Sequence, residues 1–498
     1  MIWRGIIHIF LFSMLIAHIS VAANQDSFWI QDKFVIGNFI DPELSGIEAD
    51  DRKAFKKYNR AHFNTLFGQA AGFGETGNYS KYNGSGIPNT YRLKRIMEVG
   101  DLQLFVWDEK LVEWDQEKGE IVHIFDEDEM DRIIATYRDR MSREQPELRD
   151  KMIGYFVADE PNPGNELEQV LLKVQHLTSN DVSKLAFFSL FPYHIAAHKG
   201  LNNWSDYESY IEHAFNNPYT KILAYDFYFY KTNHESYAKS NGECDERNDD
   251  SPEKETINCF QFSNAKLFAD LSKKTGKSFW AFAQSFSNDS HLLPEEKHLR
   301  YSAFSYVVYG AKGIMWFTYG PVNSAEYENT IDGGKNNNKK LNNLYEGVSN
   351  VNLELKKMGP TLMRLKWIET IHGAQTDPIT FEKNLPTLTE NHFLLTSNNN
   401  IGDKMAIGIH EDTNLSYMTI WNKDYTASIP TTETLEYAGW RKPYVMDKKT
   451  GIWAKVSSSY NANSMTTTFK ISVEPGDMEL VRIGNSDITP IINLLSLE

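Results

Sequence analysis

The chain has 498 residues, of which 41% are hydrophobic and 13% aromatic, and its formal net charge is −16 at pH 7. A chain of this length and composition can bury a large core and is expected to hold more than one domain, which excludes a disordered protein. The excess of acidic residues leaves no surplus of Lys and Arg to neutralise phosphates, so we expect no nucleic-acid partner.

The first 23 residues have the layout of a signal peptide. Arg4 precedes a mostly apolar run at 6–19, and small residues follow at Ala22 and Ala23. A membrane anchor is the alternative, but the run is shorter than the roughly 20 apolar residues that a spanning helix needs. We therefore expect residues 1–23 to be removed and the protein to be exported, to the periplasm or outside the cell, with no membrane attachment after cleavage.

From residue 28 onward, short apolar runs alternate with amphipathic stretches. The runs predict eight strands, at 34–39, 64–68, 103–107, 152–158, 185–190, 222–227, 278–283 and 313–317. The amphipathic stretches predict helices at 50–58, 91–99, 128–141, 167–177, 207–215, 260–274, 295–309 and 344–358, the last ending before Gly359 and Pro360. Eight such repeats in about 330 residues favour a (β/α)8 TIM barrel over residues 28–366. An open doubly wound sheet is the alternative.

After residue 366 the pattern changes to short alternating runs without helical periodicity. Strands are predicted at 392–396, 405–409, 416–421 and 467–473, with a hairpin turn at 447–451. This spacing is typical of a small antiparallel β-sandwich, which we assign to residues 367–485, followed by a tail at 486–498.

Cys244 and Cys259 are the two cysteines of the chain, and they flank a polar segment. In an exported protein a disulfide between them is plausible. Their spacing does not form a zinc pattern with nearby histidines. The chain also lacks a phosphate-binding loop and a dinucleotide fingerprint, so we expect no metal and no cofactor.

The predicted fourth strand is followed directly by two adjacent carboxylates. In the run IGYFVADEPNP, at 153–163, the carboxylates Asp159 and Glu160 follow the apolar residues and precede Pro161. In a TIM barrel, residues directly after the strands converge on one mouth, which carries the active site. The other polar and aromatic residues near strand ends are Asn38, Asp41, Gln69, Trp107, Asp108, Tyr193, His194, Asp226, Tyr228, Tyr230, Gln284, Trp316 and Tyr319.

Aromatic faces beside carboxylates and amides suit a sugar, which offers an apolar C–H face and a rim of hydroxyls. The alternative is that some of the rings only pack between the barrel and its helices. The candidates for substrate binding are Gln69, Trp107, Tyr193, His194, Tyr228, Gln284, Trp316 and Tyr319.

The Asp159-Glu160-Pro161 motif resembles that of the barrel glycoside hydrolases whose acid/base glutamate ends strand four in Asn-Glu-Pro or Asp-Glu-Pro. The closing run EPGDMELVRI, at 474–483, also resembles the last strand of the β-sandwich that many of them carry. The resemblance covers nearly the whole chain, although the motif is short. It implies that Glu160 is the general acid, with a pKa raised by burial and by the Asp159 charge. The alternative for Asp159 and Glu160 is an N-cap of the next helix, where a proline suits the first turn.

The chain departs from this family at the end of the seventh strand, where retaining members have a second glutamate. Gln284 stands there, and an amide cannot be the nucleophile of a double displacement. Asp226 could be the second carboxylate instead, far enough from Glu160 to hold a water molecule, as inverting glycosidases require. Alternatively, Asp226 is a structural acceptor for the neighbouring tyrosines.

A lyase or dehydratase that acts on a uronate-containing oligosaccharide is the second enzymatic interpretation. His194 or a tyrosine would then be the base and Glu160 the acid, while Gln69 and Gln284 hold the substrate carboxylate. The alternative is a structural His194, because a lone histidine near a strand end is more often structural.

The sequence thus predicts an exported carbohydrate-active enzyme that degrades polysaccharide-derived oligosaccharides, most closely a glycoside hydrolase. A lyase is the first alternative, and a non-catalytic sugar-binding barrel, motivated by Gln284, is the second.

Overall fold

The computed structural model describes residues 28–42, 47–68, 98–100, 102–108, 111, 113–115, 120–230, 260–289, 291–320, 330–332, 339–373, 385–388, 392, 394–396, 401–413 and 415–484. Several predictions fall outside these residues and stay predictions. They are the signal peptide at 1–23, Gln69, most of the helix at 91–99, the pair Cys244 and Cys259, and the tail at 486–498.

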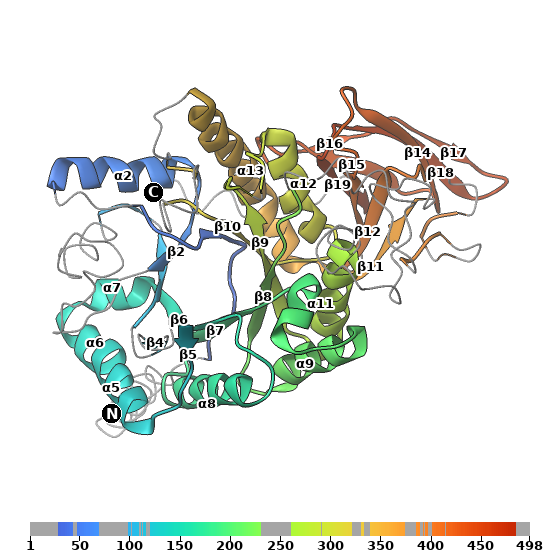
Figure 1. Ribbon diagram of the computed structural model, residues 1–498. Helices are drawn as coiled ribbons and strands as arrows, with labels where there is room; N and C mark the ends of the chain where they lie inside the picture. Colours follow the sequence, from blue (N-terminus) through green and yellow to red (C-terminus); the bar gives the residue numbers. More distant parts are fainter. Residues whose placement is uncertain are drawn as a thin grey trace, which may run out of the picture.

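Eight parallel strands form a barrel that is nearly closed (Figure 1). They are β1 (Val35–Asn38), β2 (Thr65–Gly68), β3 (Gln103–Val106), β6 (Met152–Asp159), β7 (Leu185–Leu190), β8 (Ile222–Asp226), β9 (Ser278–Gln284) and β10 (Gly313–Phe317). Each lies within one residue of its predicted position at both ends. The sheet order is β1-β10-β9-β8-β7-β6-β3-β2. Asn64 closes the gap between β2 and β1, because its N–H donates to the Ile36 carbonyl over 2.9 Å and its side-chain oxygen accepts from the Ile36 N–H over 2.8 Å.

The barrel interior is a packed core of aromatic rings. Phe105, Phe187 and Trp280 form one layer, with the Phe187 and Trp280 ring centroids 5.1 Å apart. Phe39 contacts both Phe156 and Phe282 in a second layer, at 5.7 and 5.8 Å. A filled interior leaves no channel, so polar chemistry is confined to the strand ends.

Helices surround the strands (Figure 1). They are α2 (Glu48–Arg60), α5 (Glu127–Ile134), the π-helical η1 (Ala135–Arg140), α6 (Met141–Glu144), α7 (Pro146–Lys151), α8 (Asn165–Asn180), the 3-10 helix η2 (Tyr193–Lys199), α9 (Trp204–Asn216), α11 (Gln261–Thr275), α12 (Glu296–Val307) and α13 (Lys339–Arg364). A hairpin of β4 (Glu113–Asp115) and β5 (Glu120–Val122) was not predicted. None of the described helices is long and apolar enough to cross a membrane.

The predicted helix end before Gly359 and Pro360 is wrong, because α13 continues to Arg364. Pro360 removes one backbone donor from the helix. Gly359 lies against Phe34, and a Cβ at this position would come within 2.9 Å of the Phe34 Cβ. The helix therefore continues through Gly359 and Pro360, at the point where it packs closely on Phe34 of the barrel.

Two antiparallel sheets follow the barrel and form a sandwich. The first contains β11 (Lys366–His372), β12 (Met405–Asp412), β13 (Leu415–Asn422), β19 (Met478–Gly484), β15 (Lys442–Met446) and β16 (Trp453–Lys455). The second contains β14 (Thr431–Ala438), β18 (Thr466–Val473) and β17 (Ser458–Asn461). The fold is thus a TIM barrel with a C-terminal β-sandwich, as predicted. The strand predicted at 392–396 is not formed, since Leu395 makes only an isolated bridge with Tyr437 among the described residues of this stretch.

The first sheet is covered on both faces, which follows from the two-residue alternation of a strand. On β13, Met418 and Ile420 face the second sheet in the sandwich core. Trp421 faces the barrel, where its ring lies 5.0 Å from Tyr301 of α12 and 5.7 Å from Phe262 of α11. The first sheet therefore packs directly on the barrel helices (Figure 1).

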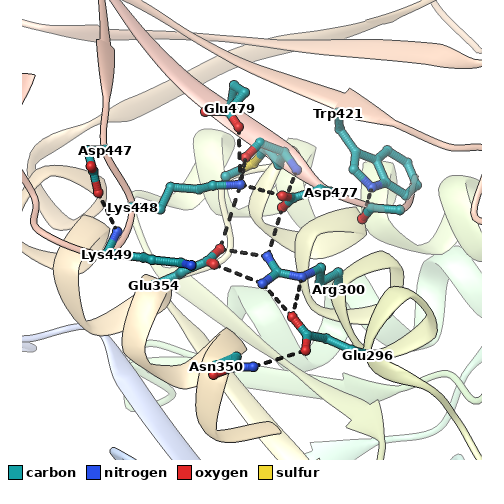
Figure 2. Close-up of polar contacts among 12 residues, drawn as sticks. Glu296, Arg300, Asn350, Glu354, Trp421, Asp447, Lys448, Lys449, Asp477 and Glu479 are labelled. Atoms are coloured by element: carbon teal, nitrogen blue, oxygen red, sulfur yellow. Dashed lines mark hydrogen bonds and ion pairs between the residues drawn. The ribbon is translucent and has the colours of Figure 1, made fainter. Parts of the chain in front are cut away.

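A buried charge network joins the barrel to the sandwich (Figure 2). Arg300 of α12 donates to both carboxylate oxygens of Glu354 on α13, over 2.7 and 2.8 Å, and to Asp477 before β19 over 3.2 Å. Lys448, in the turn after β15, contacts Asp477 over 2.6 Å and Glu479 over 3.3 Å. Burial raises the pKa of Glu479 to about 7. The network contains more carboxylates than cations. Removal of either cation would therefore leave buried carboxylates without a positively charged partner.

Candidate active site

A β-bulge orients the carboxylates at the end of β6. The register between β6 and β7 shifts between Phe156 and Ala158, so that Asp159 pairs with Ser189. Such a bulge moves the following side chains to the opposite face of the strand. Asp159 Oδ1 consequently accepts a hydrogen bond from Ser189 Oγ over 2.6 Å. Asp159 therefore faces the barrel mouth together with Ser189.

Glu160 adopts a left-handed backbone conformation, with φ of 48°. Its N–H donates to the Ser189 carbonyl over 3.1 Å, and Lys199 Nζ lies 3.3 Å from its carbonyl oxygen. The next carbonyl, of Pro161, accepts from the Tyr210 hydroxyl over 2.7 Å. A non-glycine residue in this region costs about 1 kcal/mol or more and persists only where its surroundings hold it, which is common at functional sites.

The carboxyl groups of Glu160 and Asp226 meet at the mouth, close enough for each to affect the pKa of the other. Asp226 ends β8, and the preceding Tyr225 packs outward against Phe268 at 4.3 Å, so Asp226 points toward the mouth. Burial, followed by the Asp226 and Asp159 charges, raises the pKa of Glu160 well above its usual range. Burial also raises the pKa of Asp226, to about 6. Burial and the neighbouring carboxylates therefore favour the protonated form of Glu160.

Aromatic rings line the mouth beside the carboxyl pair. Tyr228 lies close enough to Asp226 to lower its pKa, and the Tyr228 ring lies 5.5 Å from that of Phe317, at the end of β10. Phe317 in turn lies 5.6 Å from Phe39, which is also 5.6 Å from Trp107. Tyr228, Phe317 and Trp107 are partly exposed, whereas Phe39 is buried beneath them. The mouth thus combines exposed ring faces with carboxyl groups.

Gln284 does not offer its amide to a substrate, contrary to the prediction. Its side chain is 1% exposed. The amide oxygen accepts from the Tyr230 N–H over 3.0 Å, and the amide nitrogen donates to the carbonyls of Tyr230, Phe286 and Leu292 over 3.1 to 3.3 Å. A carboxylate here could not donate to these carbonyls. Gln284 is therefore suited to fasten the loops after β8 and β9.

Trp316 and Tyr319 are not substrate contacts either, because both are buried behind the barrel wall at 0% exposure. Trp316 Nε1 donates to Asn352 of α13 over 2.7 Å. Tyr319 packs against Tyr58 of α2 at 4.9 Å and against Phe63 at 5.6 Å. These rings fill the space between strands and helices.

Two other strand-end polar residues are structural. The Asn38 side chain donates to the Ile40 carbonyl and accepts from the Tyr58 hydroxyl. Asp108 accepts from Tyr137 over 3.1 Å and from Arg132 over 3.3 Å, both on the helical side. Neither faces the mouth.

Tyr193 and His194 lie on η2, after β7. The Tyr193 ring packs against Trp204 at 4.8 Å and Phe260 at 4.5 Å, in an aromatic cluster of its own. His194 packs edge-on against Phe227 at 5.2 Å, next to Asp226 in the chain. His194 therefore packs near the end of β8, whereas Tyr193 belongs to the separate aromatic cluster.

Three residues of the site were missed by sequence analysis. Ser189 and Phe317 stand inside predicted strands, and counting alternate residues from the inward Phe187 would have found Ser189. Lys199 follows strand β7 by nine residues, at the end of η2, and no local pattern marks it.

Comparison with known proteins finds similar folds but no similar sequences. No family model matches the chain, and no curated protein matches it. Its fold resembles a solved "Glycoside hydrolase", with a TM-score of 0.53 and 13% identity over 93% of this chain and 96% of the other.

Two further solved structures resemble the chain with similar TM-scores and sequence identities. A glycoside hydrolase family 5 protein from Bacteroides vulgatus ATCC 8482 has a TM-score of 0.51 and 13% identity, over 92% of this chain and 90% of its own. The β-galactosidase from Bacillus circulans sp. alkalophilus has a TM-score of 0.50 and 8% identity, over 91% and 99%. These three structures are thus glycoside hydrolases or a β-galactosidase, and each likeness extends over more than nine-tenths of this chain. At these identities it establishes the fold, whereas the chemistry must be argued from the site.

Proposed function

We propose that the protein is a glycoside hydrolase in which Glu160 is the general acid and Asp226 is the second catalytic carboxylate. The meeting of these two carboxyl groups at the ends of β6 and β8, where burial raises the pKa of both, carries the proposal. Burial and neighbouring carboxylates raise the pKa of Glu160 well above the usual range, which favours its protonated form, and burial raises the pKa of Asp226 to about 6. A protonated carboxyl beside an ionised one is the pair that glycoside cleavage requires.

The chemistry follows from the two protonation states. A sugar ring stacks on the exposed faces of Trp107 and Phe317, and Glu160 donates its proton to the glycosidic oxygen as the bond to the anomeric carbon breaks. The Asp226 carboxylate then bonds to that carbon and forms a glycosyl-enzyme intermediate. Water hydrolyses the intermediate while Glu160 accepts the water proton, which restores the starting state.

We propose this retaining route, rather than the inverting one expected from sequence, because the carboxyl groups of Glu160 and Asp226 are close enough to affect each other's pKa. Retaining enzymes hold their two carboxyl groups ~5–5.5 Å apart, whereas inverting enzymes hold them ~6.5–9.5 Å apart with a water molecule between them.

Gln284 argues against both alternative functions. The lyase interpretation needed its amide to hold a substrate carboxylate, but that amide is occupied by backbone partners. The non-catalytic interpretation treated it as the remnant of a nucleophile, but its contacts give it an independent structural role.

A screen of neutral aryl glycosides and of neutral and uronate-rich polysaccharide digests tests the proposal. We expect new reducing ends without the ultraviolet absorbance of an unsaturated uronate. Absorbance at that band would identify elimination instead, and binding without any product would identify a sugar-binding protein. We also propose that the protein is exported, from the layout of residues 4–23, which the mass of the mature protein would reveal.

A further inference from the structure

Lys199 is a cation at the base of the candidate site. It is the last residue of η2, which ends because Gly200 adopts a left-handed φ of 80°. Its ammonium group lies 3.3 Å from the Glu160 carbonyl oxygen and 5.7 Å from the centroid of the Phe191 ring. Lys199 is partly buried, so its charge is screened less than that of a fully exposed lysine.

The backbone contact supports the unusual conformation of Glu160. Ser189 of β7 accepts from the N–H of Glu160, and Lys199 donates to the carbonyl on its other side. Both partners come from the same strand and its following 3-10 helix. The left-handed residue is thus held from both sides by one segment of the chain.

The charge of Lys199 acts on the same carboxyl groups. It favours the ionised forms of Asp159 and Glu160, and so opposes the rise in pKa that burial causes in both. The other titratable groups around this position are Asp226 of β8, Tyr207 and Tyr210 of α9, and His123 after β5. Lys199 therefore offsets the negative charge that accumulates at the mouth.

We propose that Lys199 is a positioning residue for the general acid. Its ammonium group fixes the left-handed Glu160 peptide, and its positive charge keeps the Glu160 proton transferable. The inference rests on the proposed function, because it gives Glu160 the role of proton donor. A lysine that only stabilised the fold would act on the backbone without affecting proton transfer.

Comparison of Lys199→Met with Lys199→Arg tests the proposal. Loss of the charge raises the pKa of Glu160, so the alkaline limb of the kcat/KM profile moves to higher pH, by roughly one unit. We expect this shift together with a fall in kcat for Lys199→Met. Lys199→Arg keeps the charge and is expected to keep the wild-type limb.

Lys184→Met is the matched control. Lys184 also donates to backbone carbonyls, those of Arg149 and Met152 over 2.9 and 2.6 Å, but near the opposite end of β6. We expect a lower melting temperature for this variant and an unchanged alkaline limb. An alkaline limb that stays in place in Lys199→Met, in a variant that still melts cooperatively, would overturn the proposal.

An infrared titration of the Glu160 carboxyl separates this inference from the proposed function. It follows the pH at which Glu160 loses its proton and needs no substrate. If the wild-type protein cleaves no glycoside but Lys199→Met still shifts this titration upward, the proposed function fails and the electrostatic role of Lys199 stands. If glycosides are cleaved and the titration does not shift, the inference about Lys199 fails alone.

Discussion

Replacing Glu160 with glutamine is expected to lower kcat on glycosides with poor leaving groups by about 10²–10⁴-fold, because the amide cannot donate a proton of comparable acidity. The two side chains have the same shape, so sugar binding should be retained. Glycosides with an activated aryl leaving group need less protonation of the departing oxygen, and we expect a smaller loss for them. Steady-state kinetics on a pair of substrates that differ only in the leaving group measures the difference.

Glu168→Gln is the matched control for this substitution. Glu168 lies on α8, the helix after β6, and its side chain is 56% exposed in a contact with the equally exposed His213. An exposed ion pair of this kind contributes little to stability, and Glu168 lies outside the candidate site. We therefore expect kcat to remain near the wild-type value. Equal losses for poor and activated leaving groups in Glu160→Gln would contradict the role of Glu160 as the acid.

Replacing Arg300 with methionine is expected to destabilise the protein by about 3–5 kcal/mol, because it leaves buried carboxylates without their cation. Glu354 and Asp477 are 4% and 8% exposed, and Arg300 contacts both (Figure 2). The three residues come from α12, α13 and the turn before β19, so the loss should loosen the sandwich from the barrel. Urea unfolding, followed by far- and near-ultraviolet circular dichroism, measures the change and shows whether the two domains separate.

A second substitution distinguishes a charge effect from lost packing. Adding Glu354→Leu to Arg300→Met removes a stranded carboxylate and should recover part of the stability. Arg52→Met is the control. Arg52 pairs with Glu48 and Glu98, but its side chain is 47% exposed. We therefore expect this substitution to lower the free energy of unfolding by less than about 1 kcal/mol. If Arg300→Met costs no more than Arg52→Met, the network does not hold the domains together.

Strand positions were predictable because a buried parallel strand is a continuous apolar run. The run that ends in Asp159 and Glu160 marked β6 and its carboxylates together, and Asp226 was marked in the same way by β8. The bulge after Phe156 was not predictable, since it changes the pairing of β6 without leaving a pattern of residue types.

The direction of side chains beyond a strand end was the main source of error. Trp316 and Tyr319 have the composition of a sugar platform, but they point toward α13 and α2. Gln284 has the position of a nucleophile, but the loops around it occupy its amide. Lys199 lies 39 residues from Glu160 in the chain, and only the return of η2 to the mouth brings them together.

The central claim is that Glu160 is protonated and can act as the acid, and infrared spectroscopy of protein carrying 13C at the glutamate side-chain carboxyl tests it without any substrate. Glu479 also has a raised pKa, so the informative signal is the difference between the wild-type protein and Glu160→Gln at pH 7. We predict that a protonated-carboxyl band of the wild-type protein is lost in Glu160→Gln and retained in Glu168→Gln. A difference spectrum that contains only an ionised carboxylate band would contradict the account.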